Sequence, residues 1–279
     1  MRLLHGRPVA ERVNARTKER VAALAARGVT PKLAIVSAGE FPDARTYRWR
    51  IAKLAKELGI AESEQAFPSA DESQLGAHLR RGTGDAHGIL VLTPLPPNIS
   101  EDAIASHVPT EKDVEGIHPE NVGLLTLGRP RFIPSTAEAV LELLRFYDTK
   151  IDGAHAVVIG RSPVVGRPAA TLLLHAHATV TLAHSRTADL AMHTRDARIV
   201  VVAVGKKGFL RGEMLAPGAT VIDAGINVTP AGLVGDVDVD TVSGVAGALS
   251  PVPGGLGAVT TALLLRNVVT AAERQGGIR

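Results

Sequence analysis

Short apolar runs rich in valine and isoleucine alternate with helical patterns along the whole chain, and this alternation limits the possible folds most. Strands are predicted at residues 33–37, 88–92, 156–159, 179–182, 199–204 and 220–222. Helices are predicted at residues 8–27, 43–58, 73–81, 135–147, 166–176 and 260–274. Strands that are apolar along their whole length are typical of parallel sheets covered on both faces. The sequence therefore predicts an α/β fold with parallel sheets.

The composition of the 279 residues excludes several classes of protein. There is no cysteine, which excludes a disulfide framework and thiolate chemistry. The formal net charge is only +3, so no strongly basic face for nucleic acid is indicated. Residues 1–16 contain no apolar signal segment, and no apolar run is long enough to span a bilayer. We therefore expect a cytoplasmic protein that binds neither nucleic acid nor membrane.

Two segments rich in proline and glycine divide the chain. Residues 128–134 read GRPRFIP and precede Ser135, a suitable cap for the next predicted helix. Residues 250–257 read SPVPGGLG and precede the last predicted helix. We interpret the first segment as the boundary between an N-terminal lobe and a nucleotide-binding lobe. The pattern alone does not decide which lobe the last helix joins.

The predicted strand at 156–159 runs directly into the glycine-containing segment GRSPVVGRP at 160–168. A strand, a tight turn and then a helix from Gly166 would point backbone amides and the positive helix end at a pyrophosphate. The spacing of Gly160 and Gly166 differs from the usual G-x-G-x-x-G pattern, however. The spacing alone therefore leaves open both a dinucleotide site and an ordinary joint between a strand and a helix.

The end of the next predicted strand favours the dinucleotide site. An NAD-binding protein usually places an acid about here for the ribose hydroxyl, whereas an arginine accommodates the 2′-phosphate of NADP. This chain has Ser185 and Arg186 at that point, no acid, and Arg161 in the preceding turn. These residues favour NADP over NAD. The alternative is that they are ordinary solvated turn residues.

Six blocks of residues resemble, in order, those of the methylenetetrahydrofolate dehydrogenase/cyclohydrolase (FolD) family. The segment VIGRSPVVGRP at 158–168 resembles the family signature G-R-S-x-x-V-G-x-P. The other blocks are GILVLTPLP at 88–96, KDVEGIHP at 112–119 with NVG at 121–123, VIDAGIN at 221–227, VGDV at 234–237 and PVPGGLG at 251–257. One block would be weak evidence, and the resemblance rests on their order over residues 6–274.

The resemblance implies NADP-dependent oxidation of 5,10-methylenetetrahydrofolate to the methenyl form, in one-carbon metabolism that serves purine biosynthesis. In most members hydrolysis to 10-formyltetrahydrofolate follows in the same cleft. The implied fold is two α/β lobes that flank the cleft, usually in a homodimer, and the last helix returns to the first lobe. The folate-binding catalytic lobe would then be residues 1–134 plus 258–279. Residues 135–257 would form a Rossmann-like NADP-binding domain.

The resemblance also implies which residues form the sites. The residues expected to bind NADP are Gly160, Arg161, Ser162, Val165, Gly166, Ser185, Arg186, Val204, Gly205 and Ile226. The residues expected to bind the folate are Tyr47, Leu92, Pro94, Glu115, Pro253, Gly254 and Gly255. The catalytic positions are Tyr47, Ile51, Leu92 and Glu115. No metal site is expected, because two histidines spaced like His175 and His177 at a helix end are more often solvated.

Two catalytic positions depart from the family. The family motif Tyr-x-x-x-Lys reads YRWRI here, so Tyr47 is retained and Ile51 replaces the lysine. A single apolar stripe of the predicted helix contains Tyr47, Ile51, Leu54, Ala55 and Leu58, so position 51 should face inward. The glutamine that hydrogen-bonds the family lysine is Leu92 here. Because both partners are replaced, no unpaired amide remains, and we interpret the pair as a remodelled site with weak or lost cyclohydrolase activity.

Two further departures concern the pocket expected to hold the pterin ring. Glu115 replaces the family aspartate, which keeps the carboxylate but moves it by one methylene, and Ala258 and Val259 replace the usual Pro-Met. These changes leave open a dehydrogenase for another one-carbon carrier, such as a methanopterin-like cofactor. A non-catalytic NADP-binding protein that keeps the fold is the other alternative.

Overall fold

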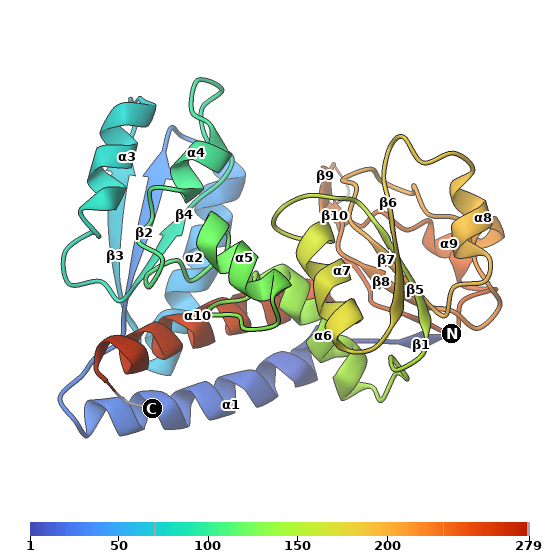
Figure 1. Cartoon of the computed structure of the whole chain (residues 1–279), viewed down its shortest axis with the longest axis horizontal. Coiled ribbons are helices and arrows are strands. Elements are labelled where there is room, and N and C mark those ends of the chain that lie inside the picture. Colours follow the sequence, from blue (N-terminus) through green and yellow to red (C-terminus); the bar gives the residue numbers. More distant parts are fainter. Residues whose placement is uncertain (70, 231, 278–279) are drawn as a thin grey trace. The chain divides into compact units, whose positions relative to one another are not determined.

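The structure is a computed structural model that describes residues 1–69, 71–230 and 232–277 (Figure 1). The chain divides into two compact units. Residues 1–11 and 134–260 form one, called here the six-stranded unit, and residues 12–133 and 261–279 form the other, the three-stranded unit. The helices α1 (Gly6–Ala25) and α10 (Leu256–Gln275) each begin in the six-stranded unit and continue into the three-stranded unit.

The sheet of the three-stranded unit has the order β3-β2-β4, and all its strands are parallel. Its strands are β2 (Lys32–Ala38), β3 (Ala61–Phe67) and β4 (Gly88–Val91). Its further helices are α2 (Pro42–Leu58), α3 (Glu72–Arg80), α4 (Glu101–Ala105) and α5 (Pro119–Thr126). Asp113 forms a parallel bridge with Ile89, so the chain beyond α4 continues along the free edge of β4.

Both faces of this sheet are buried, and side chains alternate between them along β2. Leu33 and Ile35 enter one apolar cluster, which they share with residues of α2 and α10. Ala34, Val36 and Ala38 enter a second cluster together with residues of α3. This arrangement explains why β2 is apolar in the sequence at every position but the first and Ser37.

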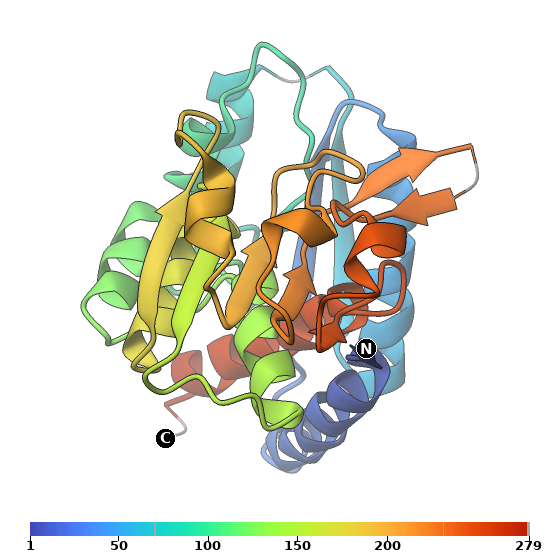
Figure 2. The same cartoon turned by 90° about the vertical axis from the view of Figure 1, so that its right-hand side faces the viewer.

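The sheet of the six-stranded unit has the order β1-β11-β8-β7-β5-β6 and is parallel throughout. Its strands are β1 (Arg2–Leu3), β5 (His155–Ile159), β6 (Thr179–Ala183), β7 (Ile199–Val202), β8 (Thr220–Asp223) and β11 (Ala248–Leu249). Its helical segments are α6 (Ser135–Phe146), α7 (Gly166–His175), α8 (Leu190–Thr194), the 3₁₀ turn Gly212–Met214 and α9 (Val239–Val242). An antiparallel hairpin of β9 (Asn227–Thr229) and β10 (Gly232–Val234), orange in Figure 2, extends from this sheet.

The order of these strands reverses at β5. The chain leaves β5 through α7 to reach β6 on one side, and then returns to β7 on the other side of β5. In open parallel sheets, ligands bind beyond the carboxyl ends of the strands at such a reversal point. The segments that follow β5 and β7 therefore mark the expected place for a ligand in this unit.

The structure confirms the α/β class and contains every predicted strand and helix. The last helix begins at Leu256 rather than at residue 260, and β7 ends at Val202 rather than at residue 204. Elements that were not predicted include β3, whose residues alternate between half-buried and exposed, as suits the edge of a sheet. The N-terminal segment pairs with the second sheet, because β1 lies along β11. In the described part of the chain, no helix combines the length and the apolar character needed to cross a membrane.

Candidate functional site

The apolar stripe predicted on α2 faces the core of the three-stranded unit. Ile51 has no exposed surface, and Leu92, directly after β4, is 4% exposed. Both belong to one buried apolar cluster, against which the half-buried Tyr47 packs. Among the described residues, the buried side-chain polar atoms without a hydrogen-bond partner are in Asn14 and Ser135, outside this cluster. The apolar side chains at positions 51 and 92 therefore leave no unpaired polar group there.

Glu115 reaches the same end of the sheet from a different segment. Its segment runs beside β4, where the Ile89 amide donates to the Lys112 carbonyl at 2.8 Å. Gly116 follows with φ +67°, and a Cβ there would lie 2.9 Å from the Phe132 carbonyl oxygen. Only glycine fits this turn without a shift of the backbone. The turn therefore fixes the position of the half-buried Glu115 side chain.

Burial raises the pKa of both titratable side chains among the predicted catalytic positions, Glu115 and Tyr47. Burial, with the negative charges of Asp113 and Glu101 added, raises the pKa of Glu115 to about 8. Burial also raises the pKa of the Tyr47 hydroxyl, with a contribution from Glu115 and an opposing one from Arg50. At neutral pH, Tyr47 is therefore protonated and Glu115 is protonated in most molecules.

Asp113 is a buried acid that the sequence reasoning did not single out. Its Oδ2 accepts hydrogen bonds from the Asn121 side chain at 2.7 Å and from the His118 amide at 2.8 Å. Burial raises the pKa of Asp113, and these hydrogen bonds oppose the rise. The sequence gives only a weak signal for it, since Asp113 lies in the block KDVEG and directly precedes the apolar Val114.

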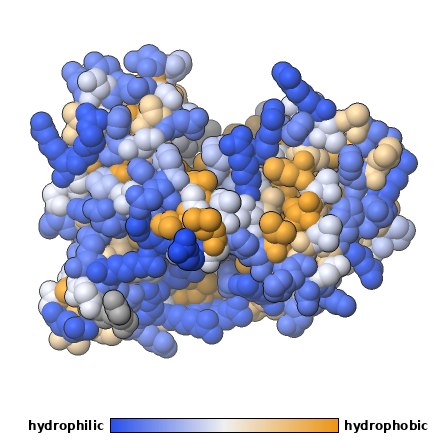
Figure 3. All heavy atoms as spheres, in the orientation of Figure 1, coloured by the Kyte–Doolittle hydropathy of each residue, from blue (hydrophilic) through white to orange (hydrophobic). Residues whose placement is uncertain are grey.

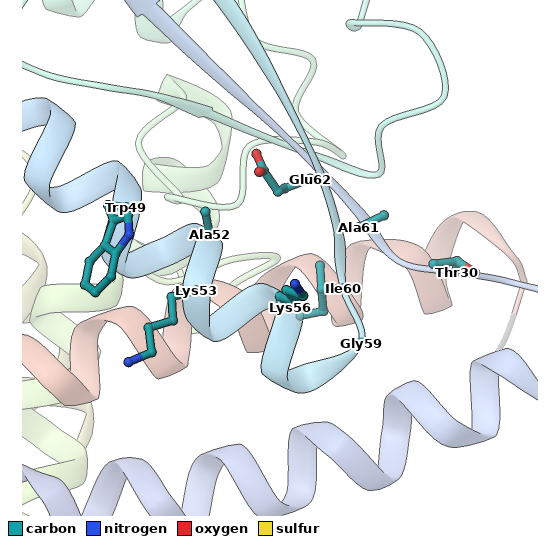
Figure 4. Close-up of a pocket in the computed structure, with 9 residues that line it drawn as sticks. All are labelled: Thr30, Trp49, Ala52, Lys53, Lys56, Gly59, Ile60, Ala61 and Glu62. Atoms are coloured by element: carbon teal, nitrogen blue, oxygen red, sulfur yellow. The ribbon is translucent and has the colours of Figure 1, made fainter.

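The opposite face of α2 carries an open groove of 660 Å³ that holds none of the predicted site residues. Figure 4 shows Trp49, Lys53 and Lys56 on this face. Trp49 is 63% exposed, and the Lys53 ammonium lies 5.4 Å from the centre of its ring. Lys53 therefore points away from Tyr47 and Ile51, as the helical angle predicts.

In the six-stranded unit, a tight turn joins β5 to α7. A Cβ on Gly160 would lie 2.2 Å from the Ala203 carbonyl oxygen, and one on Gly166 would lie 2.0 Å from the Gly160 oxygen. The Ser162 hydroxyl accepts hydrogen bonds from the amides of Val165 and Gly166, at 3.1 and 3.3 Å. The sequence pattern of a strand, a tight turn and a helix is therefore observed.

The turn after β6 presents the two residues predicted to select NADP. His184 organises this turn, because its amide bonds the Thr187 hydroxyl at 2.9 Å and its ring nitrogen accepts from the Arg186 amide at 3.1 Å. Ser185 and Arg186 are exposed, and so is Arg161 after the neighbouring strand β5. Parallel pairing places the carboxyl ends of β5 and β6 at one edge of the sheet, so these three residues share that edge.

The remaining residues expected at the nucleotide follow β7 and β8, at the same edge. Val204 is half-buried, Gly205 is exposed and Ile226 is 67% exposed. The amides of Val204 and Gly205 donate to the Asp236 carboxylate at 2.6 and 2.9 Å. Strand β7 ends two residues early for this reason, because these amides bond Asp236 instead of a neighbouring strand. Asp236 was not singled out, although the block VGDV contains it.

The residues expected to bind the folate divide between the two units. Pro94 is exposed in the three-stranded unit, after a cis Thr93–Pro94 bond, whereas Pro253, Gly254 and Gly255 belong to the six-stranded unit. The Gly6 amide donates to the Gly254 carbonyl at 2.8 Å, so this glycine-rich block packs on the start of α1. Among the described residues, no group of three or more histidine or acidic side chains is arranged to hold a metal ion.

Comparisons with known proteins agree over almost the whole chain. Family models match residues 4–115 as the catalytic domain of tetrahydrofolate dehydrogenase/cyclohydrolase and residues 134–276 as its NAD(P)-binding domain. The bifunctional protein FolD of Nocardia farcinica is 46% identical over 279 residues, which covers 98% of each chain.

Two crystal structures extend this agreement to the fold. The bifunctional FolD of Campylobacter jejuni is 39% identical, with a TM-score of 0.95 and 99% of each chain covered. The Trypanosoma brucei FolD, complexed with NADP cofactor and an inhibitor, is 37% identical, with a TM-score of 0.93 and 98% of each chain covered. The chain therefore belongs to the tetrahydrofolate dehydrogenase/cyclohydrolase family.

Proposed function

We propose that this chain oxidises 5,10-methylenetetrahydrofolate to the methenyl form with NADP, and that it hydrolyses the product weakly or not at all. The family assignment and the NADP-bound Trypanosoma brucei structure support the first part. One observation carries the second part: Ile51 and Leu92 are both buried in a single apolar cluster beside Tyr47. Neither side chain can hold or transfer a proton.

The six-stranded unit has the features that NADP requires. The turn at Gly160 and Gly166 leaves no room for a side chain, so backbone can approach a pyrophosphate closely. Arg161, Ser185 and Arg186 are exposed at the same sheet edge, where they can bind a 2′-phosphate. NADP, when bound, accepts the hydride. The protein contributes mainly the alignment of donor and acceptor, which needs no proton transfer at position 51.

Hydrolysis of the methenyl cation needs more from the protein, since a water must be activated and protons must move. A lysine at position 51 would lie in a desolvated place, where its pKa falls into the range useful for this work. Arg50 is the nearest basic residue along the helix, and a guanidinium group is a poor proton carrier. Without a lysine at position 51, the hydrolysis therefore lacks its proton carrier, whereas the oxidation does not need one.

A stepwise assay tests both parts of this proposal. The purified protein is given methylenetetrahydrofolate with NADP or with NAD, and the reduced nucleotide and the methenyl product are followed separately. We expect faster reduction of NADP than of NAD, and we expect methenyl product to accumulate. A failure to reduce either nucleotide would contradict the proposed oxidation.

A second candidate is a dehydrogenase for a different one-carbon pterin carrier. The observation that favours it is that Glu115, at the position expected to contact the pterin ring, is half-buried and carries one methylene more than an aspartate. Titrations of the protein with tetrahydrofolate and with a methanopterin-like pterin distinguish the candidates, and tighter binding of the second compound would favour this alternative.

We also propose that the protein works as a homodimer in the cytoplasm. Strand β6 is an edge of the six-stranded sheet and so has one unpaired side. Figure 3 shows hydrophobic residues gathered over the region of α7 and β6, where Leu174 and Leu182 are exposed. Light scattering on the eluting protein should give twice the chain mass of 29.1 kDa. We expect Leu182→Arg to halve that mass, whereas the same change at exposed Met192 on α8 should not.

A further inference from the structure

The buried carboxylate of Asp236 has no part in the function described so far. It has no exposed surface. Its Oδ2 accepts from the amides of Val204 and Gly205 at 2.6 and 2.9 Å, and its Oδ1 accepts from the Lys206 amide at 2.8 Å. The Asn227 side chain donates to Oδ1 as well, at 2.9 Å. Four N–H donors thus meet one carboxylate, and a buried charge is stable only with such partners.

A second buried acid holds Asp236 in place. The Asp223 carboxylate accepts from the backbone amides of Asp236 and Val237, both at 3.0 Å. Two glycines make this close packing possible. A Cβ on Gly225 would lie 2.2 Å from the Asp236 carboxyl carbon, and one on Gly235 would lie 1.8 Å from an oxygen of Asp223. Backbone and carboxylates therefore fit together only with glycine at these positions.

The orientation of the peptides after β7 follows from these hydrogen bonds. In a planar trans peptide the carbonyl points away from the amide hydrogen. Since the amides of Gly205 and Lys206 point at Asp236, the carbonyls of Val204 and Gly205 point away from it. The segment follows β7, at the point beside β5 where the strand order reverses.

We propose that Asp236 is a positioning residue for the dinucleotide. Its carboxylate turns the Val204 and Gly205 carbonyls toward the place where the nucleotide lies, so that they accept from its carboxamide or ribose hydroxyl groups. Asp223 contributes indirectly, because its hydrogen bonds fix the backbone of Asp236. The inference rests on the proposed function, because it takes the ligand of this unit to be NADP.

The variant Asp236→Asn tests this role. An amide group in place of the carboxylate would point its own N–H donors at one set of backbone amides, so the segment must change its peptide orientation. We expect the dissociation constant of NADPH, measured by its fluorescence, and the KM for NADP to rise about tenfold or more. The KM for the folate should change much less. Asp240→Asn, an exposed acid on α9, is the matched control and should bind NADPH like the wild type.

The readouts separate positioning from a purely structural role. A structural role would lower the melting temperature and the active fraction but leave the KM for NADP unchanged, and that result in a folded variant overturns the inference. If Asp236→Asn does not fold, Asn227→Ala removes one of the four donors, and a rise in the NADPH dissociation constant is again expected. An unchanged constant there also overturns the inference. Absence of NADPH binding by the wild type would instead contradict the proposed function, and the inference with it.

Discussion

At the scale of single residues, Ile51 and Leu92 stand where the resemblance to the family leads us to expect a lysine and a glutamine. Both are buried in the same apolar cluster, so neither could be changed to its family counterpart alone without cost. A lysine at 51 beside Leu92 would put an ammonium among apolar groups. A glutamine at 92 beside Ile51 would leave an amide without its partner, at a cost of about 1–3 kcal/mol.

Restoring both residues should restore hydrolysis. We expect Ile51→Lys with Leu92→Gln to accelerate the hydrolysis of methenyltetrahydrofolate, measured by the decay of its absorbance. Ile51→Lys alone should lower the free energy of unfolding by about 2 kcal/mol or more. Ile51→Met is the control, since it keeps an apolar side chain of similar volume and should change neither property much. A folded double variant that binds folate without a gain in hydrolysis contradicts the role assigned to position 51.

Because the pKa of Glu115 is raised in the folded protein, the stability of the fold should depend on pH. Its folded pKa of about 8 lies above its ordinary value of 4.5, so the folded state holds a proton that the unfolded state releases between these values. Its contribution to stability is therefore largest below pH 4.5 and is lost as the pH rises to about 8.

The variant Glu115→Gln removes this charge and keeps the shape of the side chain. We expect it to melt at least about 2 °C above the wild type at pH 9, with a smaller difference at pH 5. Glu62→Gln, at an exposed position of β3, is the control and should show no such change between the two pH values. An equal difference at both pH values would mean that Glu115 does not hold its proton in the folded state.

At the scale of elements, the carboxyl ends of parallel strands gather the candidate residues in both units. Ser185 and Arg186 lie in the turn after β6, at the sheet edge they share with Arg161. If they bind the 2′-phosphate, Arg186→Ala should lower kcat/KM for NADP about tenfold or more and change that for NAD little. Arg198→Ala, just before β7 and so at the opposite end of the strands, is the control. Equal losses with both nucleotides would contradict this role of Arg186.

The sequence predicts elements well where burial is complete and poorly where it is partial. Strands β2, β5 and β7 are apolar nearly throughout and were all predicted. The edge strand β3, with Glu62 and Glu64 exposed, has no such run. The short helices α4 and α5 depend on caps and prolines, which leave only weak patterns.

In the candidate site, features set within one segment could be predicted from the sequence, whereas contacts between distant segments could not. The inward direction of position 51 follows from helical spacing, and the burial of Ile51 confirms it. The roles of Asp113, Asp223 and Asp236 depend on contacts between segments far apart in the sequence, such as the one between Asp236 and the chain after β7. Spacing within one segment cannot reveal such partners, although each of these acids lies in a block that carries the family resemblance.

At the scale of the whole molecule, the residues considered for proton transfer and those proposed to bind NADP belong to different units. Tyr47, Glu115 and their apolar neighbours belong to the three-stranded unit, and the turn at Gly160 belongs to the six-stranded unit. Of the departures inferred from the sequence, those at Ile51, Leu92 and Glu115 are in the first, where the hydrolysis would need its proton carrier, and those at residues 258–259 are in the second. The second keeps the glycines and arginines that suit NADP.

The most direct test of this account supplies methenyltetrahydrofolate alone to the purified protein, with no nucleotide. The decay of the methenyl absorbance is followed with and without protein, at a pH where spontaneous hydrolysis is slow. We predict that the two rates agree, because positions 51 and 92 hold no group that can transfer a proton. A rate that rises in proportion to the protein concentration and approaches the rate of the oxidation would contradict the account, and would mean that another group, such as Glu115, does the work that a lysine at position 51 would do.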